Sequence, residues 1–210
     1  PRGKVFDHKL TQALARMEQY LDSHLRPELL GEVRPGATVT GPVYLGVGSV
    51  VDTGALVQGP AIFGRGCRIR QGALVRGNVV AGDEVVIGHC SEVKGSILLP
   101  GAHAPHFNYV GDSILGRRVN LGAGAICSNL KLSAGNVVVR VGDRKYDTGL
   151  RKLGAIVGDG CQTGCNAVLN PGTVLGKDTL VYPGALLHGV FPARSIIKLR
   201  QHLQVERREL

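Results

Sequence analysis

The chain has 210 residues, of which 43% are hydrophobic and only 4% aromatic, with 31 glycines and no tryptophan. So few bulky rings argue against an ordinary globular core and favour a thin, repetitive aliphatic fold. The net charge of +9 suits acidic partners, but no basic run is interleaved with aromatic residues, so we expect no nucleic-acid binding. No apolar run reaches transmembrane length and the first residues lack the apolar stretch of a signal peptide, so we expect a cytoplasmic protein without membrane contact.

The first elements are helical. Residues 7–25 carry apolar side chains at helical spacing, at Leu10, Leu14, Met17 and Leu21. This spacing predicts one short amphipathic helix that ends before Pro27. We expect residues 1–32 to form a cap over the open end of the next element, and the alternative is a helix that contacts a partner or a second subunit.

A six-residue repeat follows the helix. Its apolar column is Val33, Val39, Leu45, Val51, Val57, Phe63, Ile69, Val75, Ala81, Ile87, Val93 and Leu99. A small or aliphatic residue follows each column residue from Val33 to Val93 by four positions. In such hexapeptide solenoids each hexad is one short strand and a bend, and three hexads close a coil that winds left-handed, against the usual crossover rule. The sequence therefore predicts an all-β fold, a single-stranded left-handed β-helix over residues 33–191.

The five cysteines are an odd number without paired spacing, which indicates a reducing compartment. Three of them, Cys67, Cys127 and Cys161, occupy inward repeat positions as small core residues. Cys90 and Cys165 fall near bends.

Two cations are one full coil apart. Arg76 and Lys94 are separated by eighteen residues, or three hexads, so we expect them on the same edge, one above the other. Two stacked cations can grip a phosphate, although most outward charges of a solenoid are only solvated.

The column is interrupted after Leu99, and we predict a loop over residues 100–113. The loop carries His103, His106, Asn108 and Tyr109. A histidine on such a loop is either a general base or an ordinary surface residue. The column resumes out of phase at Leu115, Leu121 and Cys127, where Asn120 and Asn129 are turn residues or ligands.

A second interruption, over residues 130–152, predicts a β-hairpin that projects from the solenoid. Val137, Val139 and Val141 share one face, and Gly142 and Asp143 form the turn. The hairpin is either a solvated arm or a wall toward a neighbouring subunit or an anionic ligand. The remaining residues 192–210 form a tail, in which Ser195 to Leu199 can add one last strand.

The motif H-x-x-Y-x-G-D, from His106 to Asp112, is followed by V-N-L-G-A-G. With the repeat from Val33 to Leu187, it resembles the acetyltransferase domain of bifunctional N-acetylglucosamine-1-phosphate uridyltransferases and of sugar-1-phosphate nucleotidylyltransferases. The resemblance implies a homotrimer with active sites between subunits. It implies transfer of acetyl from acetyl-CoA to the amine of an amino-sugar phosphate, similar to glucosamine-1-phosphate, or of a nucleotide amino sugar, with no metal required.

The resemblance also implies roles for particular residues. His106 matches the catalytic base and Tyr109 a tyrosine of the substrate cleft. Asn120 and Asn129 match two asparagines that hold the sugar and the reacting amine. The pair Arg76 and Lys94 matches the grip on the sugar phosphate, and the coenzyme A groove corresponds to Cys165 and Pro183.

Three departures from the family pattern stand out. Gly135 replaces a lysine, so Lys131 is the nearest cation and is assigned to the substrate, and Leu130 replaces a tyrosine. The glycine-rich signature of a nucleotidyltransferase is lacking, so we expect a separate nucleotidyltransferase as partner.

Three other functions stay open at this point. The solenoid also occurs in zinc hydratases of the γ-carbonic anhydrase type, for which His89, His103 and His106 would be the ligands. A scaffold that binds sugar phosphates without catalysis is another alternative. The third is an acyltransferase that uses acyl carrier protein as donor.

Overall fold

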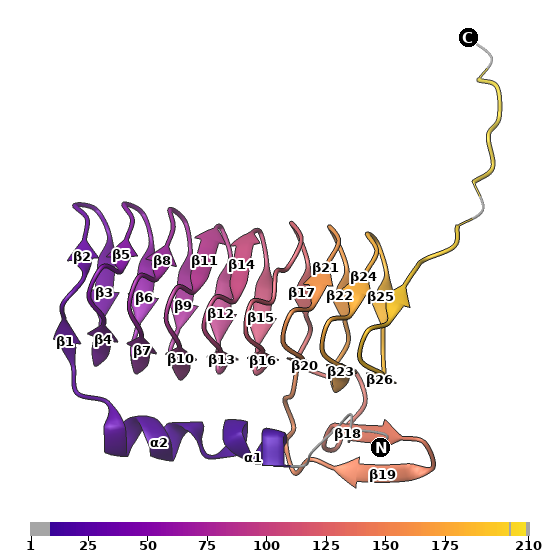
Figure 1. Cartoon of the computed structure of the whole chain (residues 1–210), viewed down its shortest axis with the longest axis horizontal. Coiled ribbons are helices and arrows are strands. Elements are labelled where there is room, and N and C mark those ends of the chain that lie inside the picture. Colours follow the sequence, from indigo (N-terminus) through magenta and orange to yellow (C-terminus); the bar gives the residue numbers. More distant parts are fainter. Residues whose placement is uncertain (1–8, 202, 209–210) are drawn as a thin grey trace.

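The computed structural model describes residues 9–201 and 203–208 and shows a left-handed β-helix whose coils stack along one axis (Figure 1). Each coil contributes one strand to each of three parallel sheets, named A, B and C here. Sheet A consists of β1 (Glu28–Leu29), β4 (Val43–Leu45), β7 (Ala61–Phe63), β10 (Val79–Ala81), β13 (Ile97–Leu98), β16 (Ile114–Leu115), β20 (Ala155–Val157), β23 (Thr173–Leu175) and β26 (Val190–Phe191). The predicted fold class is confirmed, although the first coil begins at β1 rather than at Val33.

The other two faces of the triangular prism follow the same order along the axis. Sheet B consists of β2 (Glu32–Val33), β5 (Val50–Val51), β8 (Arg68–Ile69), β11 (Val86–His89) and β14 (His103–His106), and bridges at Asn120 connect it to β21 (Gln162–Thr163), β24 (Leu180–Val181) and β27 (Ile196–Ile197). Sheet C consists of β3 (Thr38–Thr40), β6 (Leu56–Gln58), β9 (Leu74–Arg76), β12 (Glu92–Lys94), β15 (Tyr109–Gly111), β17 (Ile126–Cys127), β22 (Val168–Leu169) and β25 (Leu186–Leu187). The last strand predicted near residue 196 is therefore present as β27.

The interior is the apolar column and its small partners. Leu45, Val57, Val75 and Ile87 are fully buried, and so are small residues such as Ala61. Burying each column aliphatic contributes roughly 1.5–3 kcal/mol, so the ladder of aliphatics along the axis supplies most of the stability. The inward cysteines are confirmed, and burial raises the pKa of Cys127 to about 12, which leaves this thiol protonated and inert.

The loop predicted over residues 100–113 is wrong, because the solenoid continues through it as β14 and β15. After Val93 the next inward residue is Leu98, not Leu99, and after Val110 it is Leu115. Two steps of five residues therefore replace steps of six, and the coils that contain them are one residue shorter, as the pairing of Ile97 with Ile114 shows. A search of the sequence for an apolar residue at every sixth position therefore fails at the step from Val93 to Leu98.

Buried serines close the two short corners. The Ser96 hydroxyl donates to the carbonyl of Lys94 at 2.8 Å and accepts the Ser113 N–H at 3.0 Å. The Ser113 hydroxyl donates to the carbonyl of Gly111 at 2.7 Å and accepts the Ala155 N–H at 3.0 Å. Each hydroxyl satisfies backbone groups that a shortened turn leaves without a partner, so the two corners are built features of the coil.

Two helices, α1 (Lys9–Ala15) and α2 (Met17–His24), replace the single predicted helix, and its expected start at Asp7 lies outside the described residues. The predicted apolar positions Met17 and Leu21 are buried. The helices lie along the side of the solenoid rather than across its open end (Figure 1). Met17 shares a groove with Val80 and Ile97 of sheet A, so the expected cap over the first coil is wrong. Neither helix that the structure describes is long and apolar enough to span a membrane.

The hairpin is confirmed as β18 (Val138–Val141) and β19 (Arg144–Asp147). Its apolar face does not project into solvent, because Val137 and Val139 are 1% exposed and pack with Ile156 and Val174 on the outside of sheet A. The helices and the hairpin thus cover much of sheet A, and sheets B and C keep outward faces. Residues 202, 209 and 210 of the predicted tail lie outside the described residues.

Candidate functional site

The sequence-predicted residues lie on two edges of sheet C. The turns that lead from sheet B into sheet C form the B–C edge, and the turns that lead from sheet C into sheet A form the C–A edge. His106 ends β14 on the B–C edge, and Asp112 follows β15 on the C–A edge of the same coil. The strand between them spans about 10 Å at roughly 3.3 Å per residue.

His106 is exposed at the B–C edge, and its imidazole makes no hydrogen bond to the residues that the structure describes. Its backbone is held on both sides: its N–H donates to the Asn108 side-chain oxygen at 3.0 Å, and its carbonyl accepts the Gly124 N–H at 3.0 Å. The Asn108 amide donates to the carbonyl of Gly122 at 2.8 Å, and Asn108 is 2% exposed. A buried side chain therefore fixes the turn that carries the exposed imidazole.

The residues predicted for the coenzyme A groove, Cys165 and Pro183, follow His106 along this edge. The Asn166 N–H donates to the carbonyl of Ala123 at 2.8 Å, and the Gly184 N–H donates to that of Cys165 at 2.9 Å. His106, Ala123, Cys165 and Pro183 thus occupy equivalent turns of successive coils. All but Ala123 are exposed, so the B–C edge offers one continuous line from the imidazole to the last coils.

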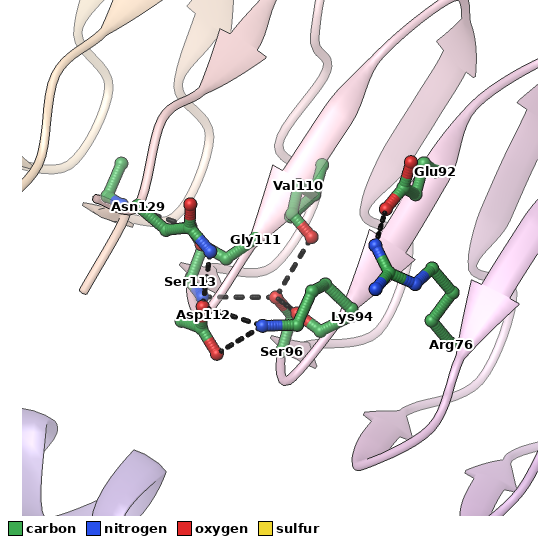
Figure 2. Close-up of polar contacts among 10 residues, drawn as sticks. Arg76, Glu92, Lys94, Ser96, Val110, Gly111, Asp112, Ser113 and Asn129 are labelled. Atoms are coloured by element: carbon green, nitrogen blue, oxygen red, sulfur yellow. Dashed lines mark hydrogen bonds and ion pairs between the residues drawn. The ribbon is translucent and has the colours of Figure 1, made fainter. Parts of the chain in front are cut away.

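The C–A edge holds a polar cluster around Asp112 (Figure 2). The Lys94 ammonium donates to both carboxylate oxygens of Asp112, at 3.1 and 3.0 Å, and the Asn129 amide donates to one of them. Lys94 and Asp112 side chains are about one-fifth exposed, and Asn129 is 9% exposed. Asp112 therefore holds the cation and the amide side by side at this edge.

Arg76 lies beside Lys94 on the neighbouring coil, as predicted from their spacing. Its guanidinium donates to the Glu92 carboxylate at 2.6 Å, and this hydrogen bond raises the pKa of Arg76 above its ordinary value. Both predicted phosphate-binding cations are thus already paired with a carboxylate. Each keeps further N–H donors for an anion.

Tyr109 extends this cluster over the outer face of sheet C. A Cβ added to Gly111 would come within 2.6 Å of the Tyr109 hydroxyl and 2.7 Å of the Asn129 amide nitrogen. The two polar ends therefore meet above Gly111, and glycine at this position leaves the room that they fill.

The other asparagine lies elsewhere. Asn120 is half-buried on the outer face of sheet B, where it bridges His103 and Gln162. One chain thus keeps His106 and Asn120 on one side, and Asn129, Lys94 and Tyr109 on the other. The single chain does not assemble the predicted site.

Lys131 lies apart from both groups, near the hairpin. Its ammonium donates to the carbonyl of Asn136 at 2.6 Å. It lines a cavity with Arg140, Asn170 and His188 rather than the cluster around Asp112.

Two further residues of this geometry, Asn108 and Asp112, were named from the sequence, but their roles were not predicted. Asp112 stands in the quoted motif, but the hexad count placed it in a loop, away from Lys94. Asn108 occupies an inward position that other coils give to alanine or serine, which becomes apparent only when the two short steps are counted.

The histidines named for the zinc alternative form no metal site in the described part of one chain, where no group of three metal-binding side chains occurs. His89 lies next to His106 along the edge, but its ring contacts the Gln71 carbonyl at 3.0 Å and the Cys90 thiol at 3.4 Å. His103 lies on the face of sheet B. Of the three histidines, one chain therefore places His89 and His106 side by side.

Comparison with known proteins agrees with the fold and the motif. The family model described as the GMPPB C-terminal domain matches residues 57–143. A bifunctional sugar-1-phosphate nucleotidylyltransferase/acetyltransferase of Sulfurisphaera tokodaii is 40% identical over 102 residues, which cover 49% of this chain and 25% of that protein. Bifunctional protein GlmU of Methanococcus vannielii is 32% identical over 189 residues, which cover 90% of this chain and 45% of that protein.

The fold also matches a solved structure. Francisella novicida UDP-N-acetylglucosamine acyltransferase aligns with a TM-score of 0.55 at 17% identity, over 77% of this chain and 62% of that one. The chain spans less than half the length of the bifunctional relatives named above. These relatives confirm the resemblance inferred from the motif at His106: the chain is similar to one part of bifunctional sugar-1-phosphate nucleotidylyltransferase/acetyltransferases, on a left-handed β-helix.

Proposed function

We propose that this protein transfers an acetyl group from acetyl-CoA to the amine of an amino-sugar phosphate, similar to glucosamine-1-phosphate, or of a nucleotide amino sugar. The observation that carries the proposal is the pair of half-sites on one coil. A free imidazole stands on the B–C edge, and a cationic and amide cluster stands on the C–A edge. The names of the bifunctional relatives support the same chemistry. The five free thiols suit the reducing cytoplasm, where we place the protein.

The half-sites meet in a homotrimer of parallel subunits. When sheet C of each subunit faces the threefold axis, the B–C edge of one subunit meets the C–A edge of the next. One of the two outward rows of sheet C suits that axis, because it is apolar along most of its length. Leu56, Leu74, Tyr109, Ile126, Val168 and Leu186 stand in register in this row, and Thr38 and Glu92 are its polar members. Leu186 is 70% exposed in the single chain, a cost that assembly removes.

Sedimentation velocity is expected to give three times the chain mass at micromolar concentration. Changing Ile126 and Leu186 together to Asp places charges on the apolar row and is expected to produce monomers. The control is Leu180→Asp on sheet B, where an exposed leucine lies outside the proposed interface and the trimer should persist. A wild-type monomer, or a trimer that only the Leu180 variant dissociates, would contradict the arrangement.

The reaction is direct transfer. The amino-sugar phosphate lies against the C–A edge, where Arg76 and Lys94 bind its phosphate and Asn129 orients the sugar and its amine. The thioester reaches His106 of the adjacent subunit along the line of Cys165 and Pro183. His106 accepts a proton as the nitrogen attacks the thioester carbonyl, backbone N–H groups near Asn129 stabilise the oxyanion, and the carbon–sulfur bond breaks to release the coenzyme A thiolate.

The test of this function is a panel of acceptors. Release of free thiol from acetyl-CoA is measured with glucosamine-1-phosphate, galactosamine-1-phosphate, glucosamine, glucosamine-6-phosphate and a nucleotide amino sugar. We expect turnover with an acceptor that carries both an amine and an anomeric phosphate. If no acceptor is acetylated but sugar phosphates still bind, the protein is a non-catalytic scaffold. If turnover occurs only with acylated acyl carrier protein, that protein and not acetyl-CoA is the donor.

Arg76→Ala and Lys94→Ala are expected to raise KM for the sugar phosphate more than they lower kcat. A phosphate contact remote from the amine supplies binding that the ground state and the transition state share. Losing one charge-assisted contact costs about 1.5–3 kcal/mol, or roughly 10- to 150-fold in KM. The control is Arg68→Ala, an exposed arginine of β8 in sheet B. The phosphate grip is wrong if both variants keep the wild-type preference for phosphorylated over unphosphorylated amino sugars.

A further inference from the structure

A cavity of about 440 Å³ lies on the C–A edge, several coils beyond the cluster around Asp112. The hairpin supplies one wall with Val138 and Arg140, and the turns after β22 and β25 supply the other with Asn170 and His188. Lys131 lines it as well. Among the described residues no carboxylate lines this cavity, so its polar lining consists of two cations, an amide and an imidazole. Such a lining suits a ligand with more than one phosphate group.

The two cations keep donors for such a ligand. The Lys131 ammonium donates one N–H to the Asn136 carbonyl, and this hydrogen bond fixes it at the cavity wall. Two N–H groups of the ammonium remain for a ligand. Asp147 lies near Lys131, but its carboxylate accepts the Gly149 N–H at 2.9 Å. Arg140 is exposed, and in the part of the chain that the structure describes it forms no ion pair.

The position of the cavity along the solenoid axis indicates which residues of a neighbouring subunit it faces. Cys165 precedes β22 and Asn170 follows it, and Pro183 precedes β25 and His188 follows it. The cavity is therefore level with the far end of the donor line. In the parallel trimer, the cavity of one subunit faces Cys165 and Pro183 of the next. Two to three coils separate this level from His106, about 10–14 Å at the roughly 4.8 Å spacing of strands, which an extended pantetheine arm can span.

We propose that this hairpin cavity binds the phosphorylated nucleotide end of coenzyme A while the thioester lies at His106 of the adjacent subunit. The inference rests on the proposed function and its trimer. It assigns Lys131 to the binding of acetyl-CoA, whereas the sequence analysis assigned this residue to the binding of the sugar. It also gives the inserted hairpin a role: one face packs on sheet A, and the opposite face, with Val138 and Arg140, lines the cavity.

The test compares two donors in one double variant, Lys131→Gln with Arg140→Gln. KM for acetyl-CoA is expected to rise at least tenfold, because two charge-assisted contacts are lost. The kinetic constants with S-acetylpantetheine, which lacks the nucleotide and its phosphates, are expected to stay at their wild-type values. The matched control is Arg144→Gln with Arg118→Gln, which removes the same charge at two exposed arginines outside the cavity lining, one of them on the same hairpin.

Titration calorimetry with coenzyme A separates this proposal from the proposed function, because it needs no turnover. Weaker binding by the double variant and not by the control supports the cavity even if no amino sugar is acetylated. If the double variant keeps the wild-type affinity for coenzyme A and the wild-type KM for acetyl-CoA, the cavity does not bind the nucleotide end. The proposed transfer reaction is unaffected by that result. An equal loss with both donors, or a rise in KM for the sugar phosphate alone, overturns the assignment to the nucleotide end.

Discussion

Replacing His106 with alanine is expected to lower kcat by about 10²- to 10⁴-fold, the usual contribution of a general base. The imidazole is exposed and outside the apolar interior, so the variant is expected to keep its fold and its trimer. Thiol release under saturating substrates measures the loss, and circular dichroism and sedimentation check the structure. A fully active variant would remove His106 from the chemistry.

A neighbouring histidine gives the control for this prediction. His103→Ala changes a half-buried histidine of the same strand, on the face of sheet B, and is expected to keep most of the activity. Equal losses in both variants, with zinc in the purified protein, would instead support the hydratase alternative.

Co-expression of His106→Ala and Asn129→Ala subunits is expected to restore activity that neither variant has alone. Each homotrimer loses one half-site at every interface, and the loss from Asn129 is expected to be about 10²- to 10³-fold, as for a residue beside the oxyanion. In a random one-to-one mixture, about a quarter of the interfaces combine an intact His106 edge with an intact Asn129 edge, since contacts in a ring are head-to-tail. Turnover per mole of protein measures the recovery.

The control mixture pairs His106→Ala with His106→Gln subunits. Every interface then carries a damaged B–C edge, so no recovery is expected. If the His106 and Asn129 mixture also stays inactive, while mixed trimers are verified by mass spectrometry, the site does not lie between subunits.

The strength of the sequence-based prediction depended on the repeat. Every coil must bury its column residues, as it does Leu45 and Val75. The regular spacing of these residues is therefore enough to predict the solenoid. The prediction failed where Leu98 replaced Leu99 as the inward residue. A one-residue deletion changes no hydrophobic content, and only the register of the neighbouring strands reveals it.

The site could be predicted by residue type more than by position. The motif identified His106, and the coil spacing placed Arg76 beside Lys94, as the structure has them. The separation of His106 from Asn129 by the width of sheet C follows from which turn each residue occupies, and this depends on the exact count of residues along the coils. The role of Asp112 was not predicted for the same reason, since its contacts arise from a corner shortened by one residue.

The helices and the hairpin on sheet A change how the solenoid can unfold. In a bare solenoid each coil contacts only its neighbours, so terminal coils fray independently and cooperativity extends over a few repeats. Here buried Met17 lines a groove with Val80 and Ile97, and Leu14 packs with the hairpin cluster that contains Val137 and Val174. This lateral packing connects α1 and α2 to coils in the middle and toward the end of the axis. Fraying from either end must break it, and it braces the coils that carry His106 and Asp112 against local opening.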